Sequence, residues 1–261
     1  MYITNIEGNK ILELKEKFHS APLFPHLVLD NFFPLEIIEG VIGEIKSNTT
    51  LNKSNDYIFA KNKFENPSLE MLGSNGKLIK EYLTSVSFKN FLSEIYGQEI
   101  FIDSEFSGGG VHRGGANSFL DMHADFELHP GNAKWKRELN ILLYLNKEWK
   151  PNYGGCLDLK NSKTGETASI EPYLNRMVIM LTKEHTLHGY KPISFPPGEF
   201  RTSIAAYAYS IASKDENNKL RSTTLWVPEK KGLAKKIVAI LTPSLVMLKQ
   251  KLFGSSTAKR K

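Results

Sequence analysis

His123 and Asp125, followed by a third candidate ligand at His188, constrain the fold of this chain more than any other feature. Residues i and i+2 of an extended strand point to the same side, so His123 and Asp125 can hold one ion from a single strand or strand end. His188 lies 65 residues further along and must come from a neighbouring strand. Two imidazoles and one carboxylate cover one face of a metal ion and leave the other face open, which is typical of a catalytic site.

Other segments of the chain predict a β-sandwich or jelly roll. Residues 139–145 and 176–181 are runs of β-forming, apolar residues, and turn signals separate them. Strands of this length favour a jelly roll over a helical bundle. Residues 201–209 predict a further strand with Arg201, Ser203 and Ala205 on one face. An arginine on such a strand is well placed to grip a carboxylate.

The N-terminal part of the chain predicts helices. Residues 34–45 carry apolar side chains near helical spacing, and residues 67–96 continue this pattern. We expect these helices to pack on the outer face of one sheet. A chain of 261 residues fits one all-β domain with added helices. The predicted fold class is therefore α+β, with a helical part at about 1–100 and a jelly-roll core at about 101–228.

Five further motifs accompany the candidate ligands. They are Tyr144-Leu-Asn-Lys-Glu-Trp149, Gly154-Gly-Cys-Leu157, Ile170-Glu-Pro172, Asn175-Arg-Met-Val-Ile179 and His188-Gly189. This ordered series resembles the Fe(II)- and 2-oxoglutarate-dependent oxygenases of the prolyl-4-hydroxylase-like kind, including the hypoxia-factor prolyl hydroxylases. Residues 25–34 are similar to the segment that often opens the N-terminal region of such enzymes. The resemblance covers about residues 22–228.

This resemblance implies a double-stranded β-helix, which is a jelly roll, and a set of cofactors. The residues implied to bind Fe(II) are His123, Asp125 and His188. Arg201 would pair with the distal carboxylate of 2-oxoglutarate, and Ser203 and Tyr144 would add hydrogen bonds to it. Dioxygen would be the second co-substrate, and ascorbate would be a stimulant. The implied reaction hydroxylates an unactivated carbon and releases succinate and carbon dioxide, with prolyl residues among the candidate substrates.

Two details of the sequence bear on this interpretation. Arg201 follows His188 at an offset of thirteen residues, slightly more than in the hypoxia-factor enzymes, because a segment rich in proline, residues 194–198, lies between them. Proline and glycine are turn residues, so we expect a longer connection between two strands. Related halogenases replace the carboxylate ligand with a small residue. The presence of Asp125 therefore favours hydroxylation.

The chain has seven histidines, so each candidate ligand has rivals. His185 is the main alternative to His188, but an odd offset places the two on opposite faces of an extended segment. We favour His188, because Gly189 after it matches the family pattern. The remaining histidines are expected in the substrate pocket or loops, at His112 and His129, or as structural residues, at His19 and His26.

Two segments near the candidate ligands have two interpretations each. The glycines at 108–110 and 114–115 lack the Lys-Ser/Thr pair of a phosphate-binding loop and predict a turn beside the site, which either closes over substrate or is simply flexible. Residues 126–137 predict a solvated loop. The alternative is contact with an anionic substrate through Lys134, Trp135, Lys136 and Arg137. Arg176, just before a buried strand, is expected to be structural.

The basic charge is concentrated at the C-terminus. Residues 229–261 contain eight lysines, one arginine and one glutamate, a balance of +8, so the other residues total −2 against a net charge of +6. We expect 1–228 to form the oxygenase domain and 229–261 a basic amphipathic tail. Its apolar run at 233–248 is too short to span a bilayer, and Pro243 interrupts it. Docking on the domain, dimerisation and contact with an anionic membrane remain open.

Location and partners follow from weaker signals. A single cysteine, Cys156, excludes an internal disulfide framework, and the first twenty residues lack the apolar core of a signal peptide. We therefore expect a cytoplasmic protein, with membrane association through the tail as the alternative. The tail has no interleaved aromatics, so no nucleic acid is expected.

Several functions remain open at this stage. Candidate substrates are a prolyl residue or other peptide, a free amino acid, a glycan and a small metabolite. One alternative is a non-catalytic jelly-roll binding protein that its basic tail recruits to a membrane or partner. Another is a zinc hydrolase or isomerase with the same three ligands, which leaves Arg201 without a role. Only the oxygenase consumes 2-oxoglutarate.

Overall fold

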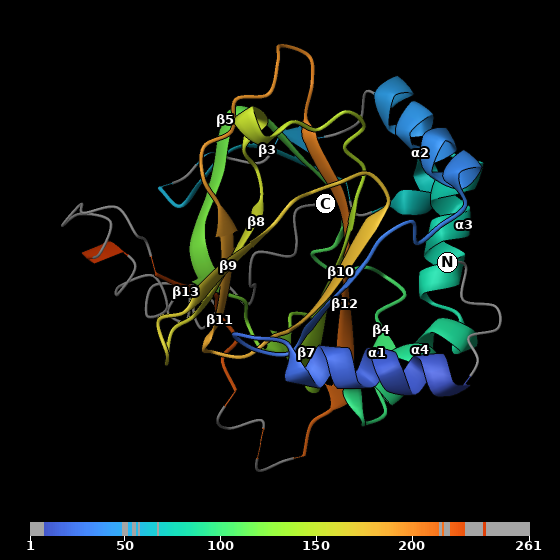
Figure 1. Cartoon of the computed structure of the whole chain (residues 1–261), viewed down its shortest axis with the longest axis vertical. Helices are drawn as coiled ribbons and strands as arrows, with labels where there is room; N and C mark the ends of the chain where they lie inside the picture. The colour runs from blue at the N-terminus through green and yellow to red at the C-terminus, as the bar shows by residue number, and fades with distance from the viewer. Residues whose placement is uncertain are drawn as a thin grey trace.

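A curled antiparallel sheet forms a half-barrel, and helices from the N-terminal part of the chain lie along its outside (Figure 1). The computed structural model describes residues 8–48, 52–53, 56, 58–66, 68–213, 216, 220–227 and 237–238. The helical elements are α1 (Gly8–Ser20), α2 (Leu35–Ser47), η1 (Leu69–Met71), α3 (Ser74–Leu83), α4 (Val86–Tyr96) and η2 (Pro151–Tyr153). The predicted α+β class with a jelly-roll core is confirmed.

Many strands that are neighbours in the sheet come from distant parts of the sequence. The strands are β1 (His26–Leu29), β2 (Asn52–Lys53), β3 (Ala60–Asn66), β4 (Phe101–Ile102), β5 (Gly110–Ala124), β6 (Leu128–His129), β7 (Asn132–Tyr144), β8 (Leu157–Asn161), β9 (Thr167–Ile170), β10 (Arg176–Leu181), β11 (Thr186–Tyr190), β12 (Arg201–Ile211) and β13 (Leu225–Trp226). The main order is β1-β10-β7-β12-β5-β11-β8-β9. Thus β5, which carries His123, lies between β12 and β11, which carry Arg201 and His188.

Alternation along the central strands separates the hydrophobic core from the interior of the half-barrel. In β7, Leu139, Ile141 and Leu143 are buried in a cluster with residues of the helices, such as Ile38 and Phe88. Their neighbours Asn140 and Leu142 line a cavity on the other face. Because side chains alternate along a strand, each central strand joins the helical layer to the site.

The predicted helices form, but turn residues divide the second segment. Residues 67–96 contain η1, α3 and α4. Gly73 precedes α3, and Ser85 begins α4 by accepting a hydrogen bond from the backbone N–H of Phe88 at 3.2 Å. Gly97 ends α4 in the left-handed conformation. The periodic pattern therefore predicted correctly that this segment is helical, whereas the capping residues determine where each helix begins and ends.

A buried carboxylate links α4 to the sheet. Glu138 on β7 is inaccessible to solvent and accepts hydrogen bonds from Tyr96 and Lys183, each at 2.6 Å, and from Ser210 at 2.7 Å. Burial alone would raise the pKa of Glu138, but the charge of Lys183 and these hydrogen bonds lower it below its usual value. The ionised form is therefore the one that the fold stabilises.

We expect Glu138→Gln to lower the free energy of unfolding by about 3 kcal/mol at pH 7, because Lys183 loses its countercharge and Tyr96 and Ser210 lose an anionic acceptor. The pKa of Glu138 is lower in the folded state, so its contribution is present above the unfolded pKa of about 4.5 and disappears as pH falls through the folded pKa. Urea unfolding of both proteins at pH 7 and at steps below 4.5 measures the difference, which should shrink on acidification. Glu13→Gln, on an exposed helix pair, is the control. A constant difference at every pH would contradict this prediction.

The predicted tail lies outside the described residues, except for 237–238. The domain boundary near residue 228 and the proposed contacts of the tail therefore stay predictions. Among the described helices, none combines the length and the apolar character that crossing a membrane requires.

Candidate metal centre

Three predicted ligands come together at the junction of two strands. His123 lies near the end of β5, Asp125 follows that strand directly, and His188 lies on β11 opposite His123 in the antiparallel register. One possible ligand atom from each residue lies within 4.8 Å of the other two. Nε2 of His123 is 3.5 Å from Asp125 Oδ1, and Nε2 of His188 is 3.7 Å from Oδ2. This geometry brings together the donor types that suit Fe(II).

The orientation of His123 leaves one nitrogen available to a metal ion. Its Nδ1 lies 3.0 Å from the backbone oxygen of Asp121, which can only accept a hydrogen bond. Nδ1 therefore carries the proton in the neutral ring, and Nε2 keeps its lone pair. Gly189 explains how β11 approaches so closely, because a Cβ at this position would lie 2.6 Å from the backbone oxygen of Leu120.

The electrostatics of Asp125 keep it ionised. Burial would raise its pKa, but the charge of Arg137, the largest opposing effect, holds that pKa well below its usual value. Arg137 Nη1 is 3.1 Å from Oδ2, and Asn140 donates to the same oxygen at 2.7 Å. These two partners fix the carboxylate in place beside the imidazoles.

His188 is ready to act as a neutral ligand. Burial, followed by the neighbouring charge of His123, lowers the pKa of His188 to about 3. Its rival, His185, does not join the cluster, because it lies in the turn just before β11. His185 therefore lies in a turn and not, as expected, on the opposite face of an extended strand.

The prediction that residues 126–137 form a solvated loop is wrong, as the position of Arg137 shows. The segment contains β6 and the first half of β7, and Arg137 is only 1% exposed. Its guanidinium lies 4.0 Å from the ring centroid of Phe126 and 3.7 Å from that of Tyr207. The sequence showed a basic cluster but not the alternation that turns this one side chain inward.

We expect Arg137→Met to weaken metal binding by about 10- to 100-fold, the usual cost of losing a partner of a ligand. The substitution keeps the volume between the two rings but leaves Asp125 without its buried countercharge. Titration of the purified protein with Mn(II), followed by electron paramagnetic resonance, measures the affinity without any turnover. Lys134→Met, which removes an exposed charge from the same strand, is the matched control. Equal affinity in wild type and Arg137→Met would contradict the prediction.

Arg201 lies on the same side of the sheet as the metal ligands. It is 7% exposed, its Nε donates to the backbone oxygen of Gly155 at 2.6 Å, and its Nη2 donates to the Tyr144 hydroxyl at 3.1 Å. Within the described part of the chain, Nη1 makes no hydrogen bond. Gly155 leaves room for this arrangement, since a Cβ there would lie 3.0 Å from Arg201 Cδ. The guanidinium is thus held in place with one end free for an anion.

A cavity of about 340 Å³ joins the two halves of the site. The three ligands, Arg201, Ser203 and Ala205 all line it, as the predicted common face of β12 requires. Tyr144 is not part of this lining and contacts Arg201 from behind. 2-Oxoglutarate has a metal-chelating 2-oxo acid group at one end and a carboxylate at the other. The three ligands and Arg201 therefore fit both Fe(II) and this co-substrate.

Several residues that the sequence did not single out also line the cavity. Trp226 on β13 stacks on His123 with ring centroids 4.8 Å apart, and Phe59, which is outside the lining, stacks on Trp226 at 4.8 Å. Lys63 and Glu65 enter from β3 and form an ion pair at 3.0 Å. These segments lie far from the ligands in sequence, and only the pairing of β3 and β13 with β5 brings them near.

The remaining candidate residues divide between the cavity and the scaffold. His112 lines the cavity. His129 is buried outside this lining and lies 3.1 Å from Asp103, so its contacts are structural. His19 and His26 contact backbone oxygens. Arg176 pairs with Asp30 and Glu171, in agreement with a structural role.

Solved structures with the same fold include several oxygenases. A prolyl-4-hydroxylase from Pseudomonas putida has a TM-score of 0.54 and 16% identity, over 76% of this chain and 99% of that chain. A prolyl hydroxylase from Trichoplax adhaerens, in complex with a hypoxia-inducible-factor peptide fragment, has a TM-score of 0.57 and 14% identity, over 82% and 97%. HygX from Streptomyces hygroscopicus, with nickel, 2-oxoglutarate and hygromycin B bound, has a TM-score of 0.52 and 12% identity, over 79% and 88%.

Sequence comparison identifies the family. A search of curated proteins gave no match. The profile of the 2OG-Fe(II) oxygenase superfamily matches residues 109–209, a stretch that contains all three candidate ligands and Arg201. This match, together with the His-Asp-His group that the region carries, identifies residues 109–209 as a region of the 2OG-Fe(II) oxygenase superfamily.

Proposed function

We propose that the protein is an Fe(II)- and 2-oxoglutarate-dependent dioxygenase that hydroxylates an unactivated carbon of its substrate. One observation carries the proposal. His123, Asp125 and His188 offer ligand atoms within 4.8 Å of one another, and Arg201 lines the same cavity. A zinc hydrolase would use the three ligands but would give Arg201 no substrate carboxylate to bind.

The proposed ligands of Fe(II) are His123, Asp125 and His188. Arg201 would bind the distal carboxylate of 2-oxoglutarate through Nη1, and Ser203 would add a hydrogen bond from the cavity wall. Tyr144 would act by holding Nη2 of Arg201 at 3.1 Å. These assignments orient the co-substrate between two fixed points, one at each end of the cavity.

When bound, iron and 2-oxoglutarate supply the oxidising chemistry: one oxygen atom of dioxygen enters the substrate as a hydroxyl group and the other enters succinate, with loss of carbon dioxide. The chain holds the reactants and limits water. The Phe59 and Trp226 rings cover one side of His123, and Arg137 keeps the charge of Asp125 balanced. The apolar wall at Leu120 and Leu142 faces the same space. A dry, preorganised pocket favours reaction with the bound substrate.

The substrate is proposed to be a peptide or a small molecule, with a prolyl residue as one candidate. Proteins of the same fold are solved with a peptide fragment and with hygromycin B. Beyond the metal end, polar groups of Lys63, Glu65 and His112 line the cavity. These groups favour a polar substrate over an aliphatic one.

Succinate formation tests the proposal. The full chain is incubated with Fe(II), 2-oxoglutarate, dioxygen and ascorbate, and a panel of prolyl peptides, amino acids and glycans is screened. We expect compounds of at least one class to raise succinate release, and the product formed from such a compound to be 16 mass units heavier than the compound itself. Release of a hydrolysis product without consumption of 2-oxoglutarate would contradict the proposal.

We also propose that residues 1–228 form the complete oxygenase domain. All of the cavity residues lie before residue 227. Deletion of residues 229–261 should therefore leave metal affinity unchanged, as Mn(II) titration measures. A loss of metal binding on deletion would show that the tail is part of the domain.

A further inference from the structure

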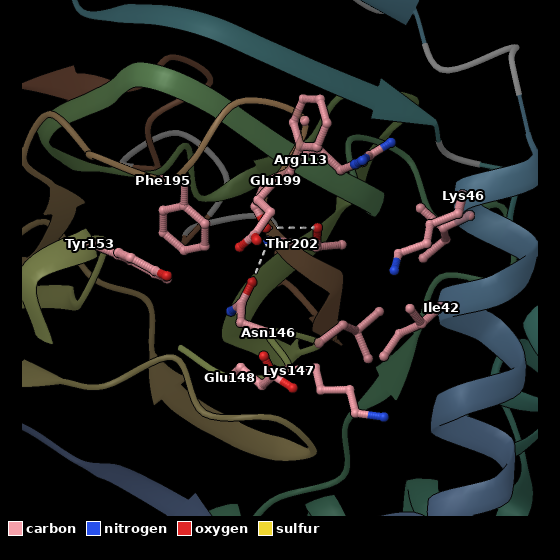
Figure 2. A pocket seen from close by; sticks show the side chains of 14 residues that line it. Ile42, Lys46, Arg113, Asn146, Lys147, Glu148, Tyr153, Phe195, Glu199 and Thr202 are labelled. Carbon is pink, nitrogen blue, oxygen red and sulfur yellow. Dashed lines mark hydrogen bonds between the residues drawn. The ribbon is translucent and has the colours of Figure 1, made fainter. Parts of the chain in front are cut away.

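A second cavity of about 560 Å³ lies between α2 and the loop that precedes β12 (Figure 2). Ile42 and Lys46 enter it from α2, Tyr153 and Phe195 lie on the opposite side, and Arg113 lies at its upper edge in the view of Figure 2. The proline-rich insertion at 194–198 thus supplies part of its wall. The insertion creates a space that the proposed oxygenase chemistry does not use.

The register of β12 and β5 shows that this cavity is separate from the metal cavity. Thr202 lines the second cavity, whereas Arg201 and Ser203, its neighbours on β12, line the metal cavity. Adjacent residues of a strand point to opposite faces. Arg113 is the cross-strand partner of Thr202 and is the one residue among those described that lines both cavities. The two spaces therefore lie on opposite faces of the sheet and approach each other at Arg113.

Arg113 forms no ion pair with any residue that the structure describes. Its guanidinium lies 3.7 Å from the ring centroid of Phe200, and its Nε is buried without a hydrogen bond. Within the described part of the chain, every other arginine side chain has a hydrogen bond or ion pair, at Arg137, Arg176, Arg201 and Arg221. Burial also lowers the pKa of Arg113. A bound oxyanion would offset this cost, and a guanidinium stacked on a ring presents its remaining donors in one plane.

Other charged groups narrow the chemistry of the ligand. Lys46 also lines the cavity and forms no ion pair among the described residues, while Lys147 is paired with Glu39 at 3.0 Å. The carboxylates of Glu148 and Glu199 line the cavity as well, but both residues are exposed. Water can solvate those acids, whereas the half-buried guanidinium of Arg113 has no acid paired with it among the described residues. The cavity therefore favours an anionic ligand over a cationic one.

We propose that the second cavity binds an organic oxyanion, a carboxylate or a phosphate ester, through Arg113 and Lys46. The apolar part of the ligand packs on Ile42, Ile45 and Phe195, which also line the space. The volume of about 560 Å³ accommodates more than an inorganic ion. The site is independent of the metal ligands.

Isothermal titration of the full-length, metal-free protein with hexanoate tests this site. Hexanoate combines one carboxylate with an apolar body, and hexylammonium has the same apolar body with the opposite charge. Inorganic phosphate tests whether the site binds a phosphate group rather than a carboxylate. We expect saturable binding of hexanoate or phosphate and none of hexylammonium. Arg113→Gln should weaken the binding at least about tenfold, because a charged hydrogen bond is lost. Lys46→Gln should weaken it as well and serves as a second variant if Arg113→Gln does not fold.

Two control variants exclude other sites. Lys147→Gln removes a cation from the same wall, but this cation is already paired, so the affinity should stay within about twofold. Arg201→Met removes the arginine of the metal cavity and should leave the affinity unchanged. Loss of binding in Arg201→Met but not in Arg113→Gln would overturn the proposal. Binding of hexylammonium alone, or no binding of either oxyanion, would overturn it too.

Discussion

Replacement of His188 by alanine should remove specific Fe(II) binding and lower succinate formation at least about 100-fold. His188 supplies one of three ligand atoms within 4.8 Å, and two remaining ligands cannot complete the proposed face of the metal. Its side chain is 12% exposed and lies opposite His123 across two paired strands, and the ligand group contains no further histidine from the described part of the chain. Metal content after dialysis and succinate release are measured on the same preparations.

His185→Ala is the matched control for this prediction. His185 is three residues away, yet it lies in the turn before β11 and outside the ligand group. We expect wild-type metal content and turnover in this variant. The opposite result, with His185→Ala inactive and His188→Ala active, would contradict the assignment of the third ligand.

Arg201→Lys should raise the KM for 2-oxoglutarate by about 100-fold while leaving metal affinity unchanged. Lysine keeps the positive charge but loses the planar fork, and with it the donors that Gly155 and Tyr144 hold in place. About 2.7 kcal/mol of lost charge-assisted hydrogen bonding corresponds to this factor. Succinate release at varied 2-oxoglutarate, together with Mn(II) titration of the same variant, separates the two effects.

Arg176→Lys controls for a general effect of arginine replacement. Arg176 lies on β10 and pairs with Asp30, away from the lining of the metal cavity. Its KM for 2-oxoglutarate should match that of wild type. An unchanged KM in Arg201→Lys would show that the distal carboxylate binds elsewhere.

Local patterns in the sequence predicted the framework of the site. The offset of two between His123 and Asp125 requires one strand, and the structure has β5 ending at Ala124 between them. The alternation in 201–209 correctly placed Arg201, Ser203 and Ala205 on one face, because side-chain direction along a strand is set by backbone geometry alone. The motif Gly154-Gly155 has a physical reason, since a side chain at 155 would crowd Arg201.

Features that depend on long-range packing were not predictable in this way. Arg137 belongs to a basic cluster that looks solvated, and its burial depends on contacts with two other segments, Asp125-Phe126 and the strand that carries Tyr207. Trp226 reaches the site only because β13 pairs with the end of β5. No periodicity in one segment encodes such contacts, because each depends on the register of strands distant in sequence.

The second cavity shows the same limit. The proline-rich segment was identified as a longer connection, and the structure confirms that it joins β11 to β12. The sequence did not indicate that Phe195 and Phe200 would meet α2 and Arg113 around an open space. Its wall combines segments that are more than 150 residues apart in the chain.

Anaerobic titration with Fe(II) and then 2-oxoglutarate tests the central claim most directly, because it detects the chelate without any knowledge of the substrate. We predict a weak visible charge-transfer band in the wild-type protein that is absent in Asp125→Ala and needs a much higher 2-oxoglutarate concentration in Arg201→Ala. Wild-type protein that binds the metal but gives no band on addition of 2-oxoglutarate would contradict the account.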